Sequence, residues 1–599
     1  MQRIFVVSLL SIILVACGGT PSPANRVAKQ VVNDKPTRSA VVDKDIAALL
    51  EDARTNDAEM QLTALINVAA KITNEDCNRG IFAAQHLKRL LAIPESQQLT
   101  FYRPLLKCYL AQQDVEAATT LLSDLADRFL QTEDILPLRY ELALLKEQWR
   151  DAAEIYYQMS DNNRENALHI WQLLDHLDTP QLQQANDGFS ALTPWLDLIM
   201  LQRSLPLTEA QLSQRIQAWK TRHNRHIFAE RFPDSFQEVI NIEPIPRTRV
   251  AVLLPLSGRW QEQGEAIKSG ILAAKFSLAE LESSIVFYDS NQLDAIPVEE
   301  LQQASIIIGP LLKENIDDFA PRTPNGVPVL YLNRVDSTLQ RRNDEQYFYS
   351  LAPEDEAQQL ALRLIQNGMK KPIVIASQSS AYQRMKQEFL STWLEKAGNT
   401  PLAMDFDSNE TLRKGIDQLL DIADSKSRIR RIENMLTPEL HSEERNRRDV
   451  DAIVVFANPS QTELINPIIE SSISPFADIV PVFASSRSFS SELNKNSLRD
   501  LRNLTFVEMP WMLPSTNLRY FQNLTTSLWP ERSDTERRLF AMGYDAFNVI
   551  PALRFLKTVP KKVFTGLTGT LVLNEQNETM RELAWAAVQE EEIQSLEMD

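Results

Sequence analysis

The pattern of apolar and polar residues changes once, near the middle of the chain. From about residue 46 to 241, apolar residues recur every three or four positions, as in the run from Leu49 to Ile72. This spacing predicts amphipathic helices. Pro244 and Pro246 then interrupt the pattern, because proline cannot continue a helix. We therefore predict a helical domain over residues 46–243 and a boundary directly after it.

Beyond the boundary, short apolar runs alternate with amphipathic segments of helix length. The predicted strands are Arg249–Pro255, Ile285–Tyr288, Ser305–Ile308, Val327–Leu332, Pro372–Ala376, Ala452–Ala457 and Val480–Ala484. This alternation indicates βαβ units and parallel sheets covered by helices on both faces. Residues 248–599 are too many for one such sheet, so we predict two α/β lobes. The fold class is therefore multidomain, α and α/β.

Pairs of alanine recur in the helical half. They stand at residues 83–84, 117–118 and 152–153, which are 34 and then 35 residues apart. Tetratricopeptide repeats have a period of about 34 residues, and small residues recur in them because paired helices approach closely. Chance alanine pairs in ordinary helices are the alternative. The surrounding leucine and aromatic residues favour a tetratricopeptide-like helical solenoid, which offers a protein-binding surface.

The N-terminal segment has the features of a targeting signal. Arg3 precedes an apolar run over residues 4–15, which is too short to span a bilayer and is typical of a signal peptide. The segment that ends at Cys17 resembles the lipobox of bacterial lipoproteins. The resemblance implies a signal peptide over 1–16 and lipidation of Cys17. Gly18 in place of aspartate implies the outer membrane, on its periplasmic side. A buried helix that ends in cysteine is the alternative.

Composition and charge narrow the classes of partner. Residues 17–45 are polar and contain several prolines, which is typical of a flexible tether. The net charge of -18 argues against nucleic acid as a partner, because binding it requires clustered lysine and arginine.

Besides Cys17, the chain has two other cysteines, Cys77 and Cys108. The periplasm would allow a disulfide between them, and two buried thiols on neighbouring helices are the alternative.

The chain lacks the common catalytic motifs. It contains no Gly-x-Gly-x-x-Gly, no P-loop, no Gly-x-Ser-x-Gly elbow and no Ser-x-x-Lys, so it is not itself a penicillin-binding enzyme. His223 and His226 could share a helix face, but they lack a neighbouring glutamate and a third ligand. We expect no enzymatic activity, no cofactor and no metal site.

Serine-rich loops follow three of the predicted strands. Ser257, Gly258 and Trp260 follow the first strand, Ser377 and Gln378 follow a later one, and residues 485–487 follow another. Open α/β sheets bind ligands at such positions, where helix N-termini can hold an anion. The loops would then line a cleft between the lobes. Ordinary turn and helix-capping chemistry also favours serine and glycine and is the alternative.

A basic segment stands out at about residues 425–450 of this acidic chain. It holds Lys426, Arg428, Arg430 and Arg431, followed by Arg445, Arg447 and Arg448. Its length and charge predict a helical insertion in the second lobe. It is either a solvated helix face or a patch that docks an acidic partner, with Arg445, Arg447 and Arg448 as the candidate contacts.

Several segments carry a family resemblance. The segment VAVLLPLSGRWQEQGEAIKSGILAA resembles the opening strand, loop and helix of type I periplasmic binding proteins. SIIIGPLLKENI, YFYSLAPEDEAQQLA, FAMGYDAFNVIPAL and FTGLTGTLVLN resemble later landmarks of that fold. Together with the lipobox and the helical half, the whole chain resembles the lipoprotein family of penicillin-binding protein activators.

That resemblance implies a non-catalytic outer-membrane lipoprotein of peptidoglycan synthesis. It would bind and stimulate penicillin-binding protein 1A, a bifunctional class A enzyme, through its receptor-like domain, with the helical domain as reach and support. The alternative function is a lipid-anchored solute receptor that holds an amino acid, a peptide or a cell-wall fragment between its lobes. Such a receptor would gain thermal stability as the ligand concentration rises.

Overall fold

The computed structural model describes residues 58–90, 92–186, 190–278, 282–335, 344–435, 443–474 and 477–596. The predicted signal peptide, Cys17 and the predicted tether over 17–45 lie outside these residues. The chain divides between Lys146 and Glu147 into two compact units, which we call the N-terminal unit and the C-terminal unit.

The described part of the N-terminal unit is helical, as predicted. Its helices are α2 (Ala58–Glu75), α3 (Cys77–Leu90), α4 (Gln98–Ala111), α5 (Val115–Ser123), α6 (Asp127–Leu130) and α7 (Leu136–Leu145). Ala84 on α3 and Ala118 on α5 are buried, as the predicted close approach of paired helices requires. Cys77 at the start of α3 and Cys108 on α4 form a disulfide, with their Cα atoms 5.3 Å apart. This resolves the alternative that the sequence left open.

More helices open the C-terminal unit. They are α8 (Trp149–Met159), α9 (Arg164–Asp175), α10 (Thr179–Ala185), α11 (Thr193–Arg203), α12 (Glu209–Arg222) and α13 (Asp234–Ile240). The third alanine pair lies on α8, and both of its side chains are fully buried. An apolar cluster joins these helices to the α/β region, because Leu205 and Val239 pack against Phe555 and Val559. The boundary between the two compact units therefore lies at residue 146, whereas the change from helices to strands lies near residue 243.

The first lobe has a parallel sheet of five strands in the order β2-β1-β3-β4-β5. The strands are β1 (Arg249–Leu254), β2 (Ser284–Asp289), β3 (Ile306–Ile308), β4 (Val329–Tyr331) and β5 (Gln346–Phe348). Its helices are α14 (Gln261–Ser277), α15 (Val298–Gln302) and α16 (Lys313–Phe319). Each face of the sheet packs into its own apolar cluster, as expected for a parallel sheet covered on both sides.

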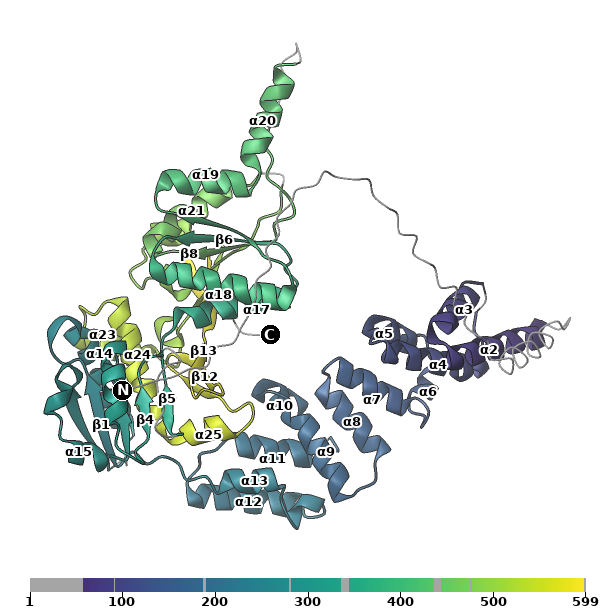
Figure 1. Ribbon diagram of the computed structural model, residues 1–599, viewed down its shortest axis with the longest axis horizontal. Coiled ribbons are helices and arrows are strands. Elements are labelled where there is room, and N and C mark those ends of the chain that lie inside the picture. The colour runs from purple at the N-terminus through teal and green to yellow at the C-terminus, as the bar shows by residue number, and fades with distance from the viewer. Residues whose placement is uncertain are drawn as a thin grey trace, which may run out of the picture. The chain divides into compact units, whose positions relative to one another are not determined.

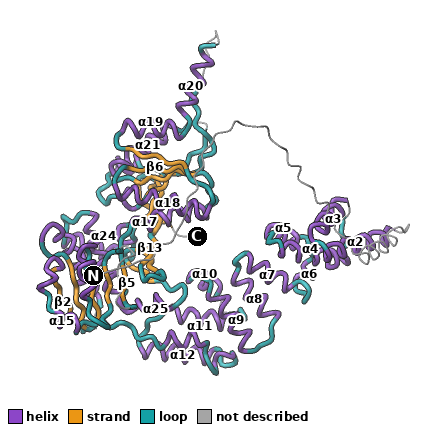
Figure 2. The backbone as a smooth tube through the Cα atoms, in the orientation of Figure 1, coloured by secondary structure: helices purple, strands orange, loops and turns teal. Residues whose placement is uncertain are grey.

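The second lobe has seven strands in the order β15-β14-β10-β9-β8-β6-β7, of which β14 and β15 are antiparallel to their neighbours. The strands are β6 (Pro372–Ser377), β7 (Leu402–Phe406), β8 (Ala452–Phe456), β9 (Val482–Ala484), β10 (Leu504–Glu508), β14 (Ala584–Gln589) and β15 (Glu592–Leu596). Its helices are α17 (Pro353–Gln366), α18 (Ser380–Ala397), α19 (Asn409–Leu419), α20 (Ile422–Glu433), α21 (Pro459–Ser472) and α22 (Lys495–Asp500). Figure 2 shows the two sheets of the lobes as separate groups of strands.

The chain passes between the lobes three times: after β5, after β10 and before β14. The connecting elements are α23 (Arg519–Leu528), α24 (Asp534–Asn548), α25 (Leu553–Thr558), and a small antiparallel sheet of β11 (Phe564–Gly566), β12 (Gly569–Leu573) and β13 (Thr579–Glu582). The two predicted α/β lobes are therefore confirmed.

Helix α24 packs directly on α14. A Cβ atom at Gly543 would lie 2.1 Å from the carbonyl oxygen of Ile267, and one at Gly270 would lie 2.0 Å from that of Phe540. Only glycine allows this approach. Met542 and Phe547 on α24 pack into the core of the first lobe. Phe540, on the same helix, packs into the core of the second lobe. Helix α24 thus belongs to both cores.

Candidate functional site

The loop that follows β1 is held within the first lobe. The carbonyl oxygen of Ser257 accepts a hydrogen bond from Asn291 Nδ2 at 2.8 Å. Gly258 has a φ of 71°, a left-handed conformation that glycine adopts without strain. The ring of Trp260 is partly exposed and carries the guanidinium of Arg259 at 4.5 Å from its centroid.

The loops that follow β6 and β9 are held by other contacts. Ser377 is buried, and its Oγ accepts a hydrogen bond from Gln461 Nε2 at 3.2 Å. Gln378 is exposed, and its backbone N–H donates to the carbonyl oxygen of Phe406 at 3.2 Å. In the loop after β9, Ser488 Oγ donates to the carbonyl oxygen of Ala457 at 2.9 Å. Among the described residues, no hydrogen bond or ion pair joins these residues to Ser257, Gly258 or Trp260. A shared solute cleft therefore stays a prediction.

Buried ion pairs lie where the chain crosses between the lobes. Glu508 ends β10, is fully buried and pairs with Arg538 on α24. Glu356 on α17 pairs with Arg581 on β13, with 3.2 Å between Oε1 and Nη2. Ser486 also donates to Glu356 from its backbone N–H and its hydroxyl, at 3.0 and 2.9 Å. Ser486, which the sequence placed in a candidate ligand loop, therefore binds a carboxylate of its own chain.

A third pair has the same character. Arg334, which follows β4 in the first lobe, binds both carboxylate oxygens of Asp355 at the start of α17, at 2.7 and 2.8 Å. Burying charges is costly unless each is paired and hydrogen-bonded. Each of these charged groups has an ion-pair partner, but Arg334 Nε and Arg581 Nε and Nη1 are buried without a hydrogen-bond acceptor. The sequence analysis missed all three pairs, because single charged residues in strands and helices carry no motif.

Asp545 on α24 is a buried carboxyl with three donors. It accepts hydrogen bonds from Leu567 N at 2.9 Å, from Thr568 N at 2.7 Å and from Thr568 Oγ1 at 2.6 Å. Burial nevertheless raises the pKa of Asp545 to about 6, and the hydrogen bonds only partly oppose that shift. Asp545 therefore titrates in a range where most carboxyl groups are already ionised.

This raised pKa predicts a pH dependence of stability. The pKa in the folded state lies above the unfolded value near 3.8, so the contribution of Asp545 is complete below that value. As the pH rises through about 6, this contribution to the free energy of unfolding is lost and stability falls by roughly 2–3 kcal/mol. We expect Asp545→Asn to remove this loss, so that the stability of wild type relative to the variant falls between pH 4 and 6. Urea unfolding across that range measures it. The exposed control Asp318→Asn should not alter the slope, and parallel wild-type and D545N profiles would contradict the prediction.

The basic segment is only partly helical. Helix α20 extends away from the second lobe (Figure 1), and residues 443–449 form no helix. Arg447 is engaged within the chain, because its Nε and Nη2 bind the two carboxylate oxygens of Asp449 at 2.6 and 2.7 Å. With Lys371, this contact holds the pKa of Asp449 well below its usual range. Arg447 is therefore a weak candidate for partner contact.

The other arginines of the segment are exposed. They are Arg428, Arg430 and Arg431 on α20, and Arg445 and Arg448 after it. Among the described residues none of them forms an ion pair, whereas Lys426 pairs with Glu444 at 3.3 Å. The structure thus leaves five guanidinium groups at one end of the second lobe.

Neither a metal site nor a membrane span is found in the described ranges. No three histidine, cysteine, aspartate or glutamate side chains there come together in a group that could hold a metal ion. None of the helices described is long and apolar enough to cross a bilayer.

A family model described as LppC putative lipoprotein matches residues 145–591. The chain belongs to the LppC family. The match begins beside the division at residue 146, so the part that defines LppC is the C-terminal unit, with helices α8–α13 and both lobes.

Curated relatives of this LppC protein are named as activators. The penicillin-binding protein activator LpoA of Photobacterium profundum is 28% identical over 437 residues, which cover 72% of this chain and 70% of the relative. That of Aliivibrio fischeri is 26% identical over 605 residues, covering 98% of both chains. The solved full-length LpoA from Haemophilus influenzae is 23% identical, with a TM-score of 0.54, and covers 93% of this chain and 98% of that one. The predicted multidomain α and α/β fold class is confirmed: a helical region is followed by two α/β lobes.

Proposed function

We propose that this LppC protein is a non-catalytic activator that binds a class A penicillin-binding protein, penicillin-binding protein 1A, and stimulates peptidoglycan synthesis. The observation that carries the proposal is the likeness to a relative named penicillin-binding protein activator LpoA along 98% of both chains. Membership of a lipoprotein family supports an anchor at Cys17 in the outer membrane, with the folded units on the periplasmic side.

Activation requires a preference for one state of the partner. A bound protein shifts an enzyme toward its active conformation only if it binds that conformation more tightly than the inactive one. A surface of fixed shape suits this role, because it does not adapt to the wrong conformation. The crossings between the lobes are fixed by the buried pairs of Glu508, Glu356 and Asp355.

Reconstitution tests the function directly. The full chain is mixed with penicillin-binding protein 1A and lipid-linked substrate, and both glycan polymerisation and peptide crosslinking are measured. We expect at least one rate to rise with the concentration of this protein and to saturate. No binding and no change in either rate would refute the activator function.

We further propose that the exposed arginines at the end of the second lobe dock an acidic surface of the partner. Reversing three of them, in Arg431→Glu/Arg445→Glu/Arg448→Glu, should weaken binding about tenfold at low salt and less at high salt, since screened surface charges steer association. Titration calorimetry at two salt concentrations measures the change. The control reverses three exposed arginines elsewhere in the same unit: Arg150, Arg225 and Arg519. Equal affinity and stimulation for wild type and the first variant would rule out this docking surface.

A further inference from the structure

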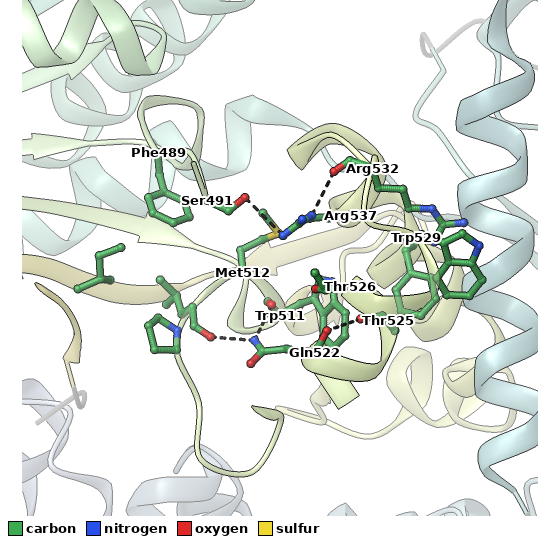
Figure 3. Close-up of a pocket in the computed structure, with 14 residues that line it drawn as sticks. Phe489, Ser491, Trp511, Met512, Gln522, Thr525, Thr526, Trp529, Arg532 and Arg537 are labelled. Carbon is green, nitrogen blue, oxygen red and sulfur yellow. Dashed lines mark hydrogen bonds between the residues drawn. The ribbon is translucent and has the colours of Figure 1, made fainter. Parts of the chain in front are cut away.

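A small cavity of about 270 Å³ lies beside the second lobe, and no residue of the predicted cleft loops after β1 and β6 lines it. The loop after β9, the segment after β10, α23 and the start of α24 surround it (Figure 3). Four aromatic rings line it, from Phe489, Trp511, Trp529 and Phe540. Of the three predicted cleft loops only the one after β9 contributes, through Phe489 and Ser491 and not through residues 485–487.

The aromatic wall is built before any ligand arrives. Trp511 and Phe540 are buried and lie 5.5 Å apart between ring centroids, and Trp529 lies 5.8 Å from Phe540. The Gln522 amide donates to the carbonyl oxygens of Trp511 and Leu513, at 2.8 and 2.9 Å, which fixes the neighbouring wall. A ligand ring that enters the cavity would therefore contact aromatic side chains that are already held in place, so that binding costs little side-chain entropy.

Two guanidinium groups also line the cavity. Arg532 lies over the ring of Trp529 at 4.0 Å and donates to Ser269 Oγ at 2.8 Å. Arg537 donates from Nε to the carbonyl oxygen of Arg532 at 3.2 Å, and its Nη1 lies 3.5 Å from Ser491 Oγ. Within the described residues neither guanidinium forms an ion pair with a carboxylate.

The nearby carboxylates are engaged elsewhere. Asp534 accepts hydrogen bonds from Ser490 Oγ, Ser491 N and Ser491 Oγ. Glu536 accepts from Ser533, and Glu265 pairs with Lys268. Glu536 and Glu265 also attract the Arg532 guanidinium, so Arg537 is the cation of the cavity that lacks a paired carboxylate among the described residues.

We propose that this cavity binds a monocarboxylate whose apolar part is a single aromatic ring or a branched group of similar size. The ring would lie against Trp511 and Phe540, and the carboxylate would accept hydrogen bonds from Arg537. Guanidinium groups bind carboxylates through short charge-assisted hydrogen bonds. The volume sets the size, since cavities for drug-sized ligands begin at about 300 Å³. The site goes beyond the proposed activator function and does not depend on it.

Ligand-observed NMR with the full chain tests the charge and the source of the ligand. The probes are 3-phenylpropionate, its neutral amide, and N-acetyl-Ala-Ala-Phe, which carries the same group at the end of a peptide. We expect 3-phenylpropionate to bind with a Kd of roughly 0.1–1 mM and the amide at least tenfold more weakly. If the peptide binds as tightly as the acid, the ligand is the C-terminal residue of a peptide. If only the acid binds, the ligand is a free small molecule.

Variants then locate the binding. Arg537→Gln should weaken the acid about tenfold and leave the amide unchanged, whereas Arg519→Gln, on α23 outside the cavity, should change neither. Thr526→Trp, which fills the cavity from its exposed rim, should abolish binding of both probes. Thermal unfolding of each variant confirms that it is folded. Equal binding of acid and amide, no binding of the acid at about 10 mM, or equal effects of R537Q and R519Q would overturn the proposal.

Discussion

Replacing Arg538 with alanine is expected to destabilise the C-terminal unit by about 3–5 kcal/mol. The variant leaves Glu508 without its ion-pair partner, and Glu508 is 0% exposed. Arg538 also donates from Nη2 to the carbonyl oxygen of Ser486 at 3.0 Å, so a second acceptor loses its donor. The backbone N–H of Met509 still donates to Glu508 at 2.7 Å, but one hydrogen bond does not offset the desolvation of a charge. Urea unfolding at neutral pH measures the loss.

The pH dependence identifies the cause. Burial raises the pKa of Glu508 above its ordinary value near 4.5. A carboxyl with a raised folded pKa contributes stability below the unfolded pKa and loses it as the pH rises through the folded one. Without Arg538 the pKa of Glu508 rises further, so the penalty should shrink as the pH falls toward about 5. Arg537→Ala, at the next position on α24, should cost less than about 1 kcal/mol because Arg537 has no ion-pair partner among the described residues. A small, pH-independent loss in R538A would contradict this account.

Removing the disulfide is expected to destabilise the N-terminal unit by about 3–4 kcal/mol. Cys77 and Cys108 are 31 residues apart, and closing a loop of that length lowers the entropy of the unfolded chain. We expect Cys77→Ser/Cys108→Ser to speed hydrogen exchange of the backbone amides in α3 and α4, with no change in the lobes of the C-terminal unit. Mass spectrometry of peptic fragments resolves these segments.

A reductant supplies the control for the disulfide. Dithiothreitol should bring wild-type exchange in α3 and α4 to the rate of the double variant, and should not affect the variant itself. If the reductant changes both proteins alike, the effect arises outside this bond. If the variant exchanges at the wild-type rate, the bond contributes nothing to stability.

Most of the buried parallel strands were predicted from the sequence, but the buried strands β5 and β10 and the polar edge strands β7 and β15 were not. Apart from Arg249 at the start of β1 and Ser377 at the end of β6, strands β1, β6 and β8 are apolar, because helices cover both faces of their sheets. Strand β7 stands at an edge with most of its side chains exposed, and β15 is polar along most of its length. Edge strands of this kind carry no strong periodic signal.

The candidate sites show a similar limit. Ser257 and Ser377 were found because serine and glycine after a strand mark a turn, but a turn does not reveal what faces it. Glu508 and Arg538 are 30 residues apart, and nothing local pairs them before the lobes fold. The disulfide stayed open for the same reason, since its geometry depends on how α3 meets α4. Contacts that depend on tertiary packing are those that the sequence analysis left undecided or missed.

Helix α24 has a consequence for any motion of the lobes. Phe540 lies in one core, whereas Met542 and Phe547 lie in the other. Opening a hinge between the lobes would therefore expose Phe540 or Phe547, at a cost of about 1.5–3 kcal/mol, in addition to the cost of breaking the Arg538 ion pair. The conformational entropy of fixing the two lobes has therefore already been lost in folding. A partner that contacts both lobes would not have to order them on binding, so more of the contact energy would appear as affinity.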